Sequence, residues 1–220
     1  PTFCTGCPHR GFFYELGKKR KKIVVAGDIG CYSLAVGEPY NMMDWIICMG
    51  ASFSSAHGAQ KIFDMNPDEN RRLVSIMGDS TFFHTGINSL LNTIYNKGNT
   101  INIILDNRIT GMTGQQDNPG SGKDLQKEVT EIMDIEKIVR ALGIKHVRRI
   151  NPNDLQANKD TINWALDLDE ASVIITDWPC KLKKTYNEED FTRYDKMWKT
   201  KNIVLEDKCV GCKACLRSGC

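Results

Sequence analysis

Two polar residues follow apolar runs at positions where they could hold a metal ion. Asp79 lies just past the run at 73–77, and Asn107 lies just past the run at 101–105. Both runs are short and flanked by turn residues, which is typical of strands buried on both faces of a parallel sheet. Carboxylate, amide and main-chain carbonyl oxygens are the ligands that Mg²⁺ prefers. The sequence therefore predicts a divalent-cation site where two neighbouring strands end.

The segment between these strands predicts a helix that would favour a diphosphate at the same place. Apolar residues recur at helical spacing from 87 to 95, and Gly98 stands where a helix would end. The helix is expected to begin near Thr81, so its unpaired N–H groups and positive dipole end would face the cation site. As an alternative, Asp79 and Asn107 could serve only as a helix cap and a turn former.

Four of the nine cysteines could converge on the same edge of the sheet. Cys4 and Cys7 form a CxxC pair, a spacing that zinc sites, redox dithiols and iron–sulfur clusters share. Cys31 follows the apolar run at 23–26, and Cys180 follows the run at 172–176. If these runs are parallel strands of one sheet, both thiols emerge beside Asp79. Four thiolates there would suit a [4Fe-4S] cluster, and a zinc site is the alternative that spacing leaves open.

A second group of cysteines occupies residues 209–220. Cys209, Cys212 and Cys215 have the CxxCxxC spacing of ferredoxins, in which a tight turn presents three thiolates to one cluster. Cys220 follows one residue later than in the common pattern, so the ligand set is incomplete. We expect the missing cysteines to lie downstream in a longer polypeptide.

The alternation of strand and helix patterns predicts an α/β fold with a doubly wound, mostly parallel sheet. Further strands are expected at 45–48 and 145–150, and further helices at 131–142 and 154–168. Cys48 is expected to be a buried core thiol. Residues 1–180 would form this domain, 181–202 a linker or docking segment with a helix near 191–198, and 203–220 the start of a small ferredoxin-like α+β module.

Composition excludes some classes of partner. The chain has 220 residues, of which 41% are hydrophobic, and 29 basic against 27 acidic residues give a net charge of only +2. No nucleic-acid partner is expected at this charge. No apolar run approaches the roughly 20 residues of a membrane span, so no membrane partner is expected. A cytoplasmic location is expected instead. Because the chain starts at Pro1 without an initiator Met, we expect it to be a piece of a longer protein.

The spacing of the polar residues resembles that of thiamine-diphosphate enzymes. Gly78, Asp79 and Ser80, followed by Asn107, are similar to the family motif that begins GDG or GDS and ends in Asn. The resemblance implies that Asp79, Asn107 and the main-chain carbonyl of Ile109 hold Mg²⁺. It also implies contacts to thiamine diphosphate from Gly30, Cys31, Gly50, Ala51, Gly78, Asp79, Ser80, Thr81, Asn107, Ile109, Gly111 and Met112, with Met112 beneath the thiazolium ring.

The cysteines make the chain similar to the 2-oxoacid:ferredoxin oxidoreductases, in which the matching four residues ligate a [4Fe-4S] cluster. The opening CxxCPHRG and the later HTGIN resemble the large subunit of the indolepyruvate (arylpyruvate) branch. The resemblance implies anaerobic, thiamine-dependent oxidative decarboxylation of an aryl 2-oxoacid to the acyl-CoA, with electrons passing through [4Fe-4S] clusters to ferredoxin. The alternatives are another 2-oxoacid such as pyruvate, a non-oxidative thiamine-dependent decarboxylase, and a zinc-stabilised binding module.

The same resemblance implies that this chain does not act alone. The Glu that activates the aminopyrimidine of thiamine comes from a separate domain in the family, so we expect it in the rest of the polypeptide or in a second subunit of a hetero-oligomer. Ferredoxin, the 2-oxoacid and coenzyme A are the further partners. No catalytic side chain is assigned here, and His9 and His84 are the candidates because each lies close in sequence to a predicted site.

Overall fold

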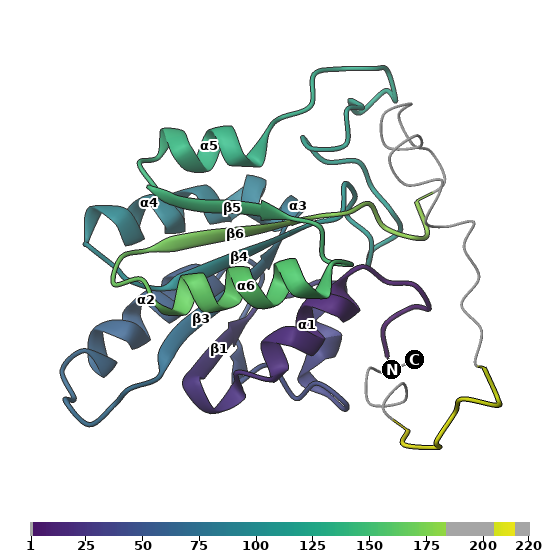
Figure 1. The fold of residues 1–220 in the computed structure, drawn as a ribbon. Coiled ribbons are helices and arrows are strands. Elements are labelled where there is room, and N and C mark those ends of the chain that lie inside the picture. Colours follow the sequence, from purple (N-terminus) through teal and green to yellow (C-terminus); the bar gives the residue numbers. More distant parts are fainter. Residues whose placement is uncertain (1, 184–204, 214–220) are drawn as a thin grey trace.

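A computed structural model describes residues 2–183 and 205–213 and shows six strands with helices between them (Figure 1). The strands are β1 (Ile23–Gly27), β2 (Trp45–Ile46), β3 (Arg72–Gly78), β4 (Ile101–Asp106), β5 (His146–Ile150) and β6 (Ser172–Asp177). The α-helices are α1 (His9–Gly17), α2 (Ser52–Phe63), α3 (Asp79–Thr81), α4 (Ile87–Tyr95), α5 (Ile135–Ala141) and α6 (Leu155–Leu166). Two short 3₁₀ segments, at Arg20–Lys22 and Cys31–Val36, and a π-helical turn, η3 (Phe82–Gly86), complete the elements.

The sheet is parallel throughout, in the strand order β2-β1-β3-β4-β6-β5. Strands β1, β3, β4 and β6 are the interior strands, and nearly every residue in them is buried. That burial explains why each is mostly apolar in sequence, without a regular alternation of polar and apolar residues. The predicted doubly wound α/β sheet is therefore confirmed.

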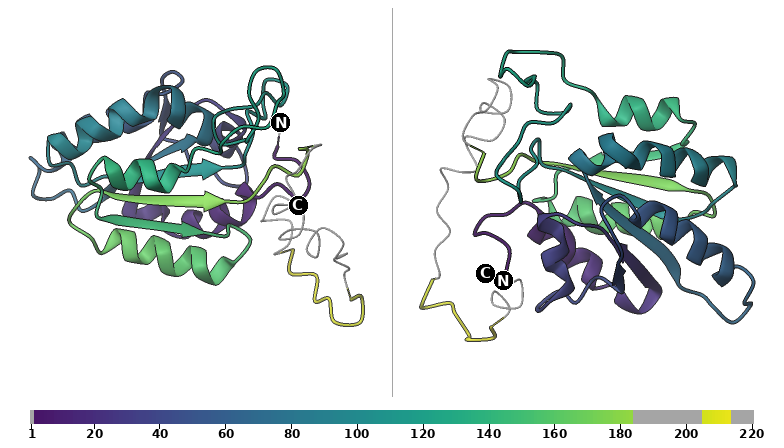
Figure 2. Two further views of the ribbon diagram at one scale, coloured as in Figure 1. Left: turned by 90° about the horizontal axis from the view of Figure 1, so that it is seen from above. Right: turned by 180° about the vertical axis from the view of Figure 1, so that it is seen from behind.

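Helices cover both faces of the sheet, as Figures 1 and 2 show. Helices α1 and α6 pack together on one face, over Val74, Ile76 and Ile103 among others. Helices α2, α4 and α5 cover the other face, where Met77 and Ile104 point. Successive residues of one strand thus enter different cores, because side chains alternate across a sheet. No helix among the described residues is long and apolar enough to cross a membrane.

The carboxyl ends of the strands form one edge of the sheet. The residues that follow β1, β3, β4 and β6 all emerge there, and Figure 1 shows the N-terminal segment and the long loop after β4 on the same side. In open α/β sheets this edge is where ligands bind. The fold therefore brings distant parts of the chain together at the edge that the sequence predicted.

Two expectations about the first half of the chain need correction. The strand expected at 45–48 covers only Trp45–Ile46, because β2 is a short edge strand that pairs with the end of β1 through two residues. Cys48 lies beyond it in a loop and is exposed, so it is not a core thiol. The helix after β3 begins at Asp79 and passes through the π-helical turn η3 before it continues as α4.

In the second half, the strand expected at 145–150 and the helix expected at 154–168 are β5 and α6, within two residues at each end. The helix expected at 131–142 begins only at Ile135, because the Asp134 side chain accepts hydrogen bonds from the N–H groups of Glu136 and Lys137 and caps it. The docking helix expected near 191–198 lies outside the described residues.

Candidate functional site

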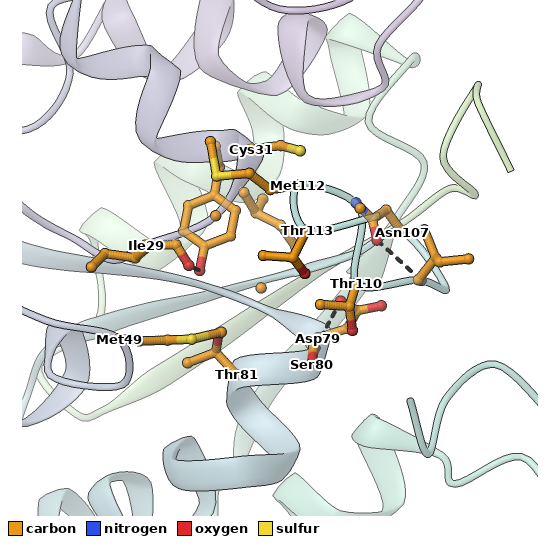
Figure 3. A pocket seen from close by; sticks show the side chains of 16 residues that line it. Ile29, Cys31, Met49, Asp79, Ser80, Thr81, Asn107, Thr110, Met112 and Thr113 are labelled. Atoms are coloured by element: carbon orange, nitrogen blue, oxygen red, sulfur yellow. Dashed lines mark hydrogen bonds between the residues drawn. The ribbon is translucent and has the colours of Figure 1, made fainter. Parts of the chain in front are cut away.

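A pocket opens at the carboxyl edge of the sheet. Figure 3 shows Asp79, Thr110 and Asn107 gathered at one end of it and the apolar side chains of Ile29 and Met49 at the other. Of the twelve residues expected to contact the cofactor, the pocket is lined by Gly30, Cys31, Gly78, Asp79, Ser80, Thr81, Asn107, Ile109, Gly111 and Met112.

The carboxylate of Asp79 lies at the end of β3 and is almost fully buried. Its Oδ1 accepts a hydrogen bond from the N–H of Ser80 at 2.7 Å, whereas Oδ2 is buried without a hydrogen-bond partner among the described residues. Burial, and then the nearby charge of Asp106, raise the pKa of Asp79 to about 7. A buried carboxylate oxygen with no donor is suited to binding a cation.

A turn at the end of β4 presents the second predicted metal ligand. Oδ1 of Asn107 accepts a hydrogen bond from the N–H of Ile109 at 3.2 Å, which fixes the side chain in the turn. The carbonyl oxygen of Asn107 accepts from the N–H of Cys180 at 2.9 Å. The N–H of Ile109 also faces Asp79, where it lowers the pKa of that carboxyl. The three residues predicted to hold Mg²⁺ thus line one pocket.

The start of the helix after β3 completes this end of the pocket. Ser80 and Thr81 lie in its first turn and line the pocket, and the helical segment runs on through η3 and α4 to Tyr95. The unpaired N–H groups and positive end of such a helix bind phosphate. A helix start beside the unpartnered Oδ2 of Asp79 fits a diphosphate bridged by a divalent cation.

The loop after β4 forms one wall of the pocket. Thr110, Gly111, Met112 and Thr113 line it, and Met112 keeps half of its surface exposed. The N–H of Thr110 and the carbonyl of Gln116 are hydrogen-bonded at 2.9 Å, which closes this loop on itself. Met112 therefore lies in the pocket, as expected of a side chain that supports a cofactor.

Gly50 and Ala51, which were also expected to contact the cofactor, are not among the residues that line the pocket, although their neighbour Met49 is. Gly50 has φ +92°, and a β-carbon on it would come within 2.2 Å of Oγ1 of Thr85. The glycine is thus needed for a left-handed turn packed against η3. Its contact is with the helix beside the pocket.

A second pocket, of about 510 Å³, adjoins the first and contains the four predicted cluster cysteines. Cys4 and Cys7 come from the N-terminal segment, Cys31 from the loop after β1, and Cys180 from the loop after β6. Three residues line both pockets, namely Cys31, Asn107 and Gly111. The four thiols are therefore gathered next to the predicted cation site.

Burial opposes the ionisation of three of these thiols. Burial, with a smaller contribution from the three other thiols, raises the pKa of Cys7 to about 12. Burial likewise raises the pKa of Cys31 and of Cys180. Main-chain N–H groups partly oppose this, with His9 facing Cys7, and Leu182 and Lys183 facing Cys180.

Cys7, Cys31 and Cys180 would ionise together only when a cationic centre binds them. N–H groups directed at the sulfurs fit an iron–sulfur cluster, whose potential such hydrogen bonds tune. Among the described residues, no three His, Cys, Asp or Glu side chains are close enough to form a site for a single metal ion.

The two candidate histidines occupy different environments. His9 lines the pocket of the four thiols, is 2% exposed, and its Nδ1 has no hydrogen-bond partner among the described residues. Burial lowers its pKa to about 4, so its ring is neutral at ordinary pH. His84 lies in η3 with its side chain exposed, and it lines neither pocket.

The second cysteine group is described only in part. Cys209 and Cys212 are free and exposed, and Cys215 and Cys220 lie outside the described residues. The predicted ferredoxin-type ligand set therefore remains a prediction.

One residue that supports the site was missed by the sequence reasoning. Asp28 directly follows β1 and is fully buried, and its carboxylate accepts hydrogen bonds from the N–H groups of Ile29, Gly50 and Ser52. It thereby joins the loop after β1 to the start of α2. The signal was present as an aspartate ending an apolar run, the same pattern that identified Asp79.

Comparisons with known proteins agree with this geometry. Residues 28–176 match the family described as "Thiamine pyrophosphate enzyme, C-terminal TPP binding domain". The chain is 36% identical to the indolepyruvate oxidoreductase subunit IorA of Pyrococcus horikoshii over 230 aligned residues, and 36% identical to that of Methanothermobacter marburgensis over 223. These alignments cover 100% and 98% of this chain but only 35% and 34% of those proteins.

A solved structure has the same fold. The 2-oxoglutarate:ferredoxin oxidoreductase of Magnetococcus marinus, with 2-oxoglutarate, coenzyme A and succinyl-CoA bound, superposes with a TM-score of 0.73 at 18% identity. The match covers 87% of this chain and 69% of that one. The chain belongs to the thiamine pyrophosphate enzymes, whose TPP-binding domain it contains, and its relatives are those that the motifs predicted, the 2-oxoacid:ferredoxin oxidoreductases.

Proposed function

We propose that this chain is the thiamine-binding part of an enzyme that oxidatively decarboxylates a 2-oxoacid to its acyl-CoA and passes the electrons to ferredoxin. The observation that carries the proposal is the shared wall of the two pockets, where Cys31, Asn107 and Gly111 contact both. A cofactor site and an electron-acceptor site side by side suit a reaction that must remove two electrons from a cofactor-bound substrate.

Each part of the chain has a defined task in this proposal. Oδ2 of Asp79, Oδ1 of Asn107 and the carbonyl of Ile109 would hold Mg²⁺, and the positive end of the helix that starts at Asp79 would favour the diphosphate beside Ser80 and Thr81. When bound, thiamine diphosphate supplies a nucleophilic carbon and an electron sink for decarboxylation.

The walls of the pockets have two further tasks. Ile29, Met49 and Met112 would exclude water from the reacting carbon. The thiolates of Cys4, Cys7, Cys31 and Cys180 would hold a [4Fe-4S] cluster as the first electron acceptor, and the cysteines at 209–220 would hold part of a second.

An aryl 2-oxoacid is the substrate we propose, because relatives in two organisms are named indolepyruvate oxidoreductases. The chain spans about a third of the length of those proteins. The remaining domains and a second subunit would supply the aminopyrimidine-activating Glu and the substrate pocket, and coenzyme A would accept the acyl group.

Analysis of bound groups tests this proposal directly. The full-length protein would be purified with its partner subunit under anaerobic conditions and assayed for iron, acid-labile sulfide, zinc and thiamine diphosphate. We expect iron, sulfide and thiamine diphosphate together. Thiamine without iron would indicate a non-oxidative decarboxylase, and zinc without thiamine would indicate a binding module, so either result would overturn the proposal.

A matched pair of variants links the cofactor to the predicted ligand. Asp79→Asn removes the charge of the unpartnered carboxylate and is expected to lose Mg²⁺-dependent thiamine diphosphate binding in calorimetric titration. Asp68→Asn changes an exposed aspartate on the loop before β3 and is expected to bind as the unmodified protein does.

A further inference from the structure

Arg108 lies between two of the predicted Mg²⁺ ligands and has an unusual backbone conformation. Its φ is +61°, in the left-handed region that residues other than glycine seldom adopt. Such a conformation costs on the order of 1 kcal/mol or more and persists where surrounding contacts impose it. It turns the chain so that Asn107 and Ile109 both line the pocket. The contacts that hold Arg108 therefore bear on the geometry of the cation site.

The guanidinium of Arg108 is held by two buried carboxylates. One nitrogen lies 2.7 Å from Oδ1 of Asp177, and Nε lies 3.4 Å from Oδ2 of Asp106. The three side chains are 12%, 2% and 7% exposed, so water screens these charges little. The N–H of Arg108 also donates to Oδ1 of Asp106 at 3.1 Å.

Asp177 connects this turn to the segment that carries the fourth thiol. It ends β6, directly beside Asp106 at the end of β4, and Cys180 follows three residues later. Two main-chain hydrogen bonds join the same segments, from Trp178 to the carbonyl of Asp106 at 3.1 Å and from Cys180 to that of Asn107 at 2.9 Å. The Arg108–Asp177 ion pair adds a side-chain link between the two turns.

The far side of Asp177 is also fixed. Its Oδ2 accepts from Arg149 on β5 at 3.2 Å, and Arg149 in turn lies 2.7 Å from Asp134, the residue that caps α5. Asp177 is therefore held in place from the edge strand and cannot follow Arg108 if the turn shifts. A rigid partner of this kind is what orients a metal ligand accurately.

We propose that the Arg108–Asp177 ion pair positions Asn107 and Ile109 for the divalent cation and, through the same contact, holds the Cys180 turn against them. Arg108 is then a positioning residue that acts through its neighbours and touches neither cation nor substrate. The inference rests on the proposed function, because it takes the cation and the cluster as the occupants of the two pockets. A single ion pair would then support both the cation site and the cluster site.

The test uses the full-length protein with its partner subunit and measures two quantities besides activity. The first is the Kd for Mg²⁺ at saturating thiamine diphosphate, and the second is the iron retained per chain after gel filtration. Loss of a residue that orients a metal ligand typically weakens metal binding by about 10- to 100-fold. We expect Arg108→Ala and Asp177→Asn to weaken Mg²⁺ binding by about tenfold or more and to retain less iron.

Three further variants separate the ion pair from other causes. Arg108→Gly keeps the backbone turn, since glycine adopts φ +61° without strain, and we expect it to behave like Arg108→Ala. Arg108→Lys should be intermediate, because an ammonium cannot contact both carboxylates as a guanidinium does. Arg71→Ala removes an exposed arginine that pairs with Glu69 on the loop before β3 and should change neither quantity.

Folding is controlled with a double variant. Because Arg108→Ala leaves the buried carboxylates of Asp177 and Asp106 without this partner, Arg108→Met is combined with Asp177→Leu, which removes the charge of Asp177 as well and leaves only that of Asp106. We expect thermal unfolding to show that this double variant folds. We still expect it to bind Mg²⁺ weakly.

Two outcomes would contradict the inference in different ways. If Arg108→Gly or the double variant binds Mg²⁺ as tightly as the unmodified protein, the ion pair does not position the ligands. If the unmodified protein itself binds neither thiamine diphosphate with Mg²⁺ nor iron, the proposed function fails, and the positioning role fails with it.

Discussion

The main-chain N–H of Cys180 donates a hydrogen bond to the carbonyl oxygen of Asn107 at 2.9 Å. This bond joins a predicted ligand of the iron–sulfur cluster to a predicted ligand of Mg²⁺ on the neighbouring strand. It exists because β4 and β6 pair in parallel, so that the residues following them leave the sheet together. The predicted cation site and the predicted cluster site are therefore joined by a main-chain hydrogen bond between adjacent strand ends.

Removal of Cys180 should remove the cluster while leaving the fold intact. In Cys180→Ser, iron and sulfide content and the broad visible absorption are expected to fall, because one of four thiolate ligands is lost. Cys48→Ser provides the matched control, since Cys48 is exposed and lines neither pocket. Full iron content in Cys180→Ser, or equal loss in both variants, would contradict this assignment.

Binding of Mg²⁺ with thiamine diphosphate should weaken as the pH falls below about 7. Burial raises the pKa of Asp79 to about 7 in the metal-free protein, so below that pH the cation must displace a proton. The Kd should rise up to about tenfold per pH unit there. Titration calorimetry in two buffers of different ionisation enthalpy would measure the released proton. A Kd independent of pH between about 5.5 and 7 would refute the prediction.

The raised pKa of Asp79 also predicts how the stability of the metal-free protein depends on pH. A carboxyl whose pKa is higher in the folded protein than its ordinary value contributes stability that is present below about pH 4 and is lost as the pH rises through about 7. Asp79→Asn cannot titrate at this position. The urea midpoint of the metal-free Asn variant should therefore fall less between acidic and neutral pH than that of the unmodified protein.

His9 should tune the cluster rather than transfer protons. Its Nδ1 is buried without a hydrogen-bond partner among the described residues, in the pocket of the four thiols. Hydrogen bonds to cluster sulfur raise the reduction potential. His9→Phe should therefore give a more negative potential in an EPR-monitored titration, at unchanged iron content, while His9→Asn keeps a donor and should shift it less.

His146→Phe, on β5 and away from both pockets, is the control for this measurement. Identical potentials in His9→Phe and His146→Phe would show that the His9 ring does not interact with the cluster.

Loss of the Asp28 carboxylate should destabilise the protein near the pocket. Three main-chain N–H groups, those of Ile29, Gly50 and Ser52, would lose their acceptor inside the protein. Leaving buried donors of this kind unpaired costs roughly 1–3 kcal/mol each before relaxation, so Asp28→Ala should lower the free energy of unfolding by about 3 kcal/mol. Urea denaturation measures this, with exposed Asp68→Ala as the control. A change under about 0.5 kcal/mol would show that the loop is held by other contacts.

The amino-acid sequence by itself determined the parallel sheet and the polar residues at its edge. Strands β3 and β4 are buried on both faces, so most of their residues are apolar, and that pattern is visible without a structure. Asp79 and Asn107 then had to leave the sheet at the same edge, because parallel strands share their direction. The match of residues 28–176 to the thiamine family agrees with this reasoning.

Only the tertiary structure decided which distant residues meet and how they are held. Cys31 and Cys180 line one pocket because β1 and β6 are parallel strands of one sheet, an arrangement that local periodicity does not encode. The exposed position of Cys48, the left-handed turn at Arg108 and its ion pair with Asp177 likewise depend on contacts between strands. Burial patterns are local in the chain and can be read from it, whereas these contacts form between segments far apart in sequence and are fixed only when the core packs.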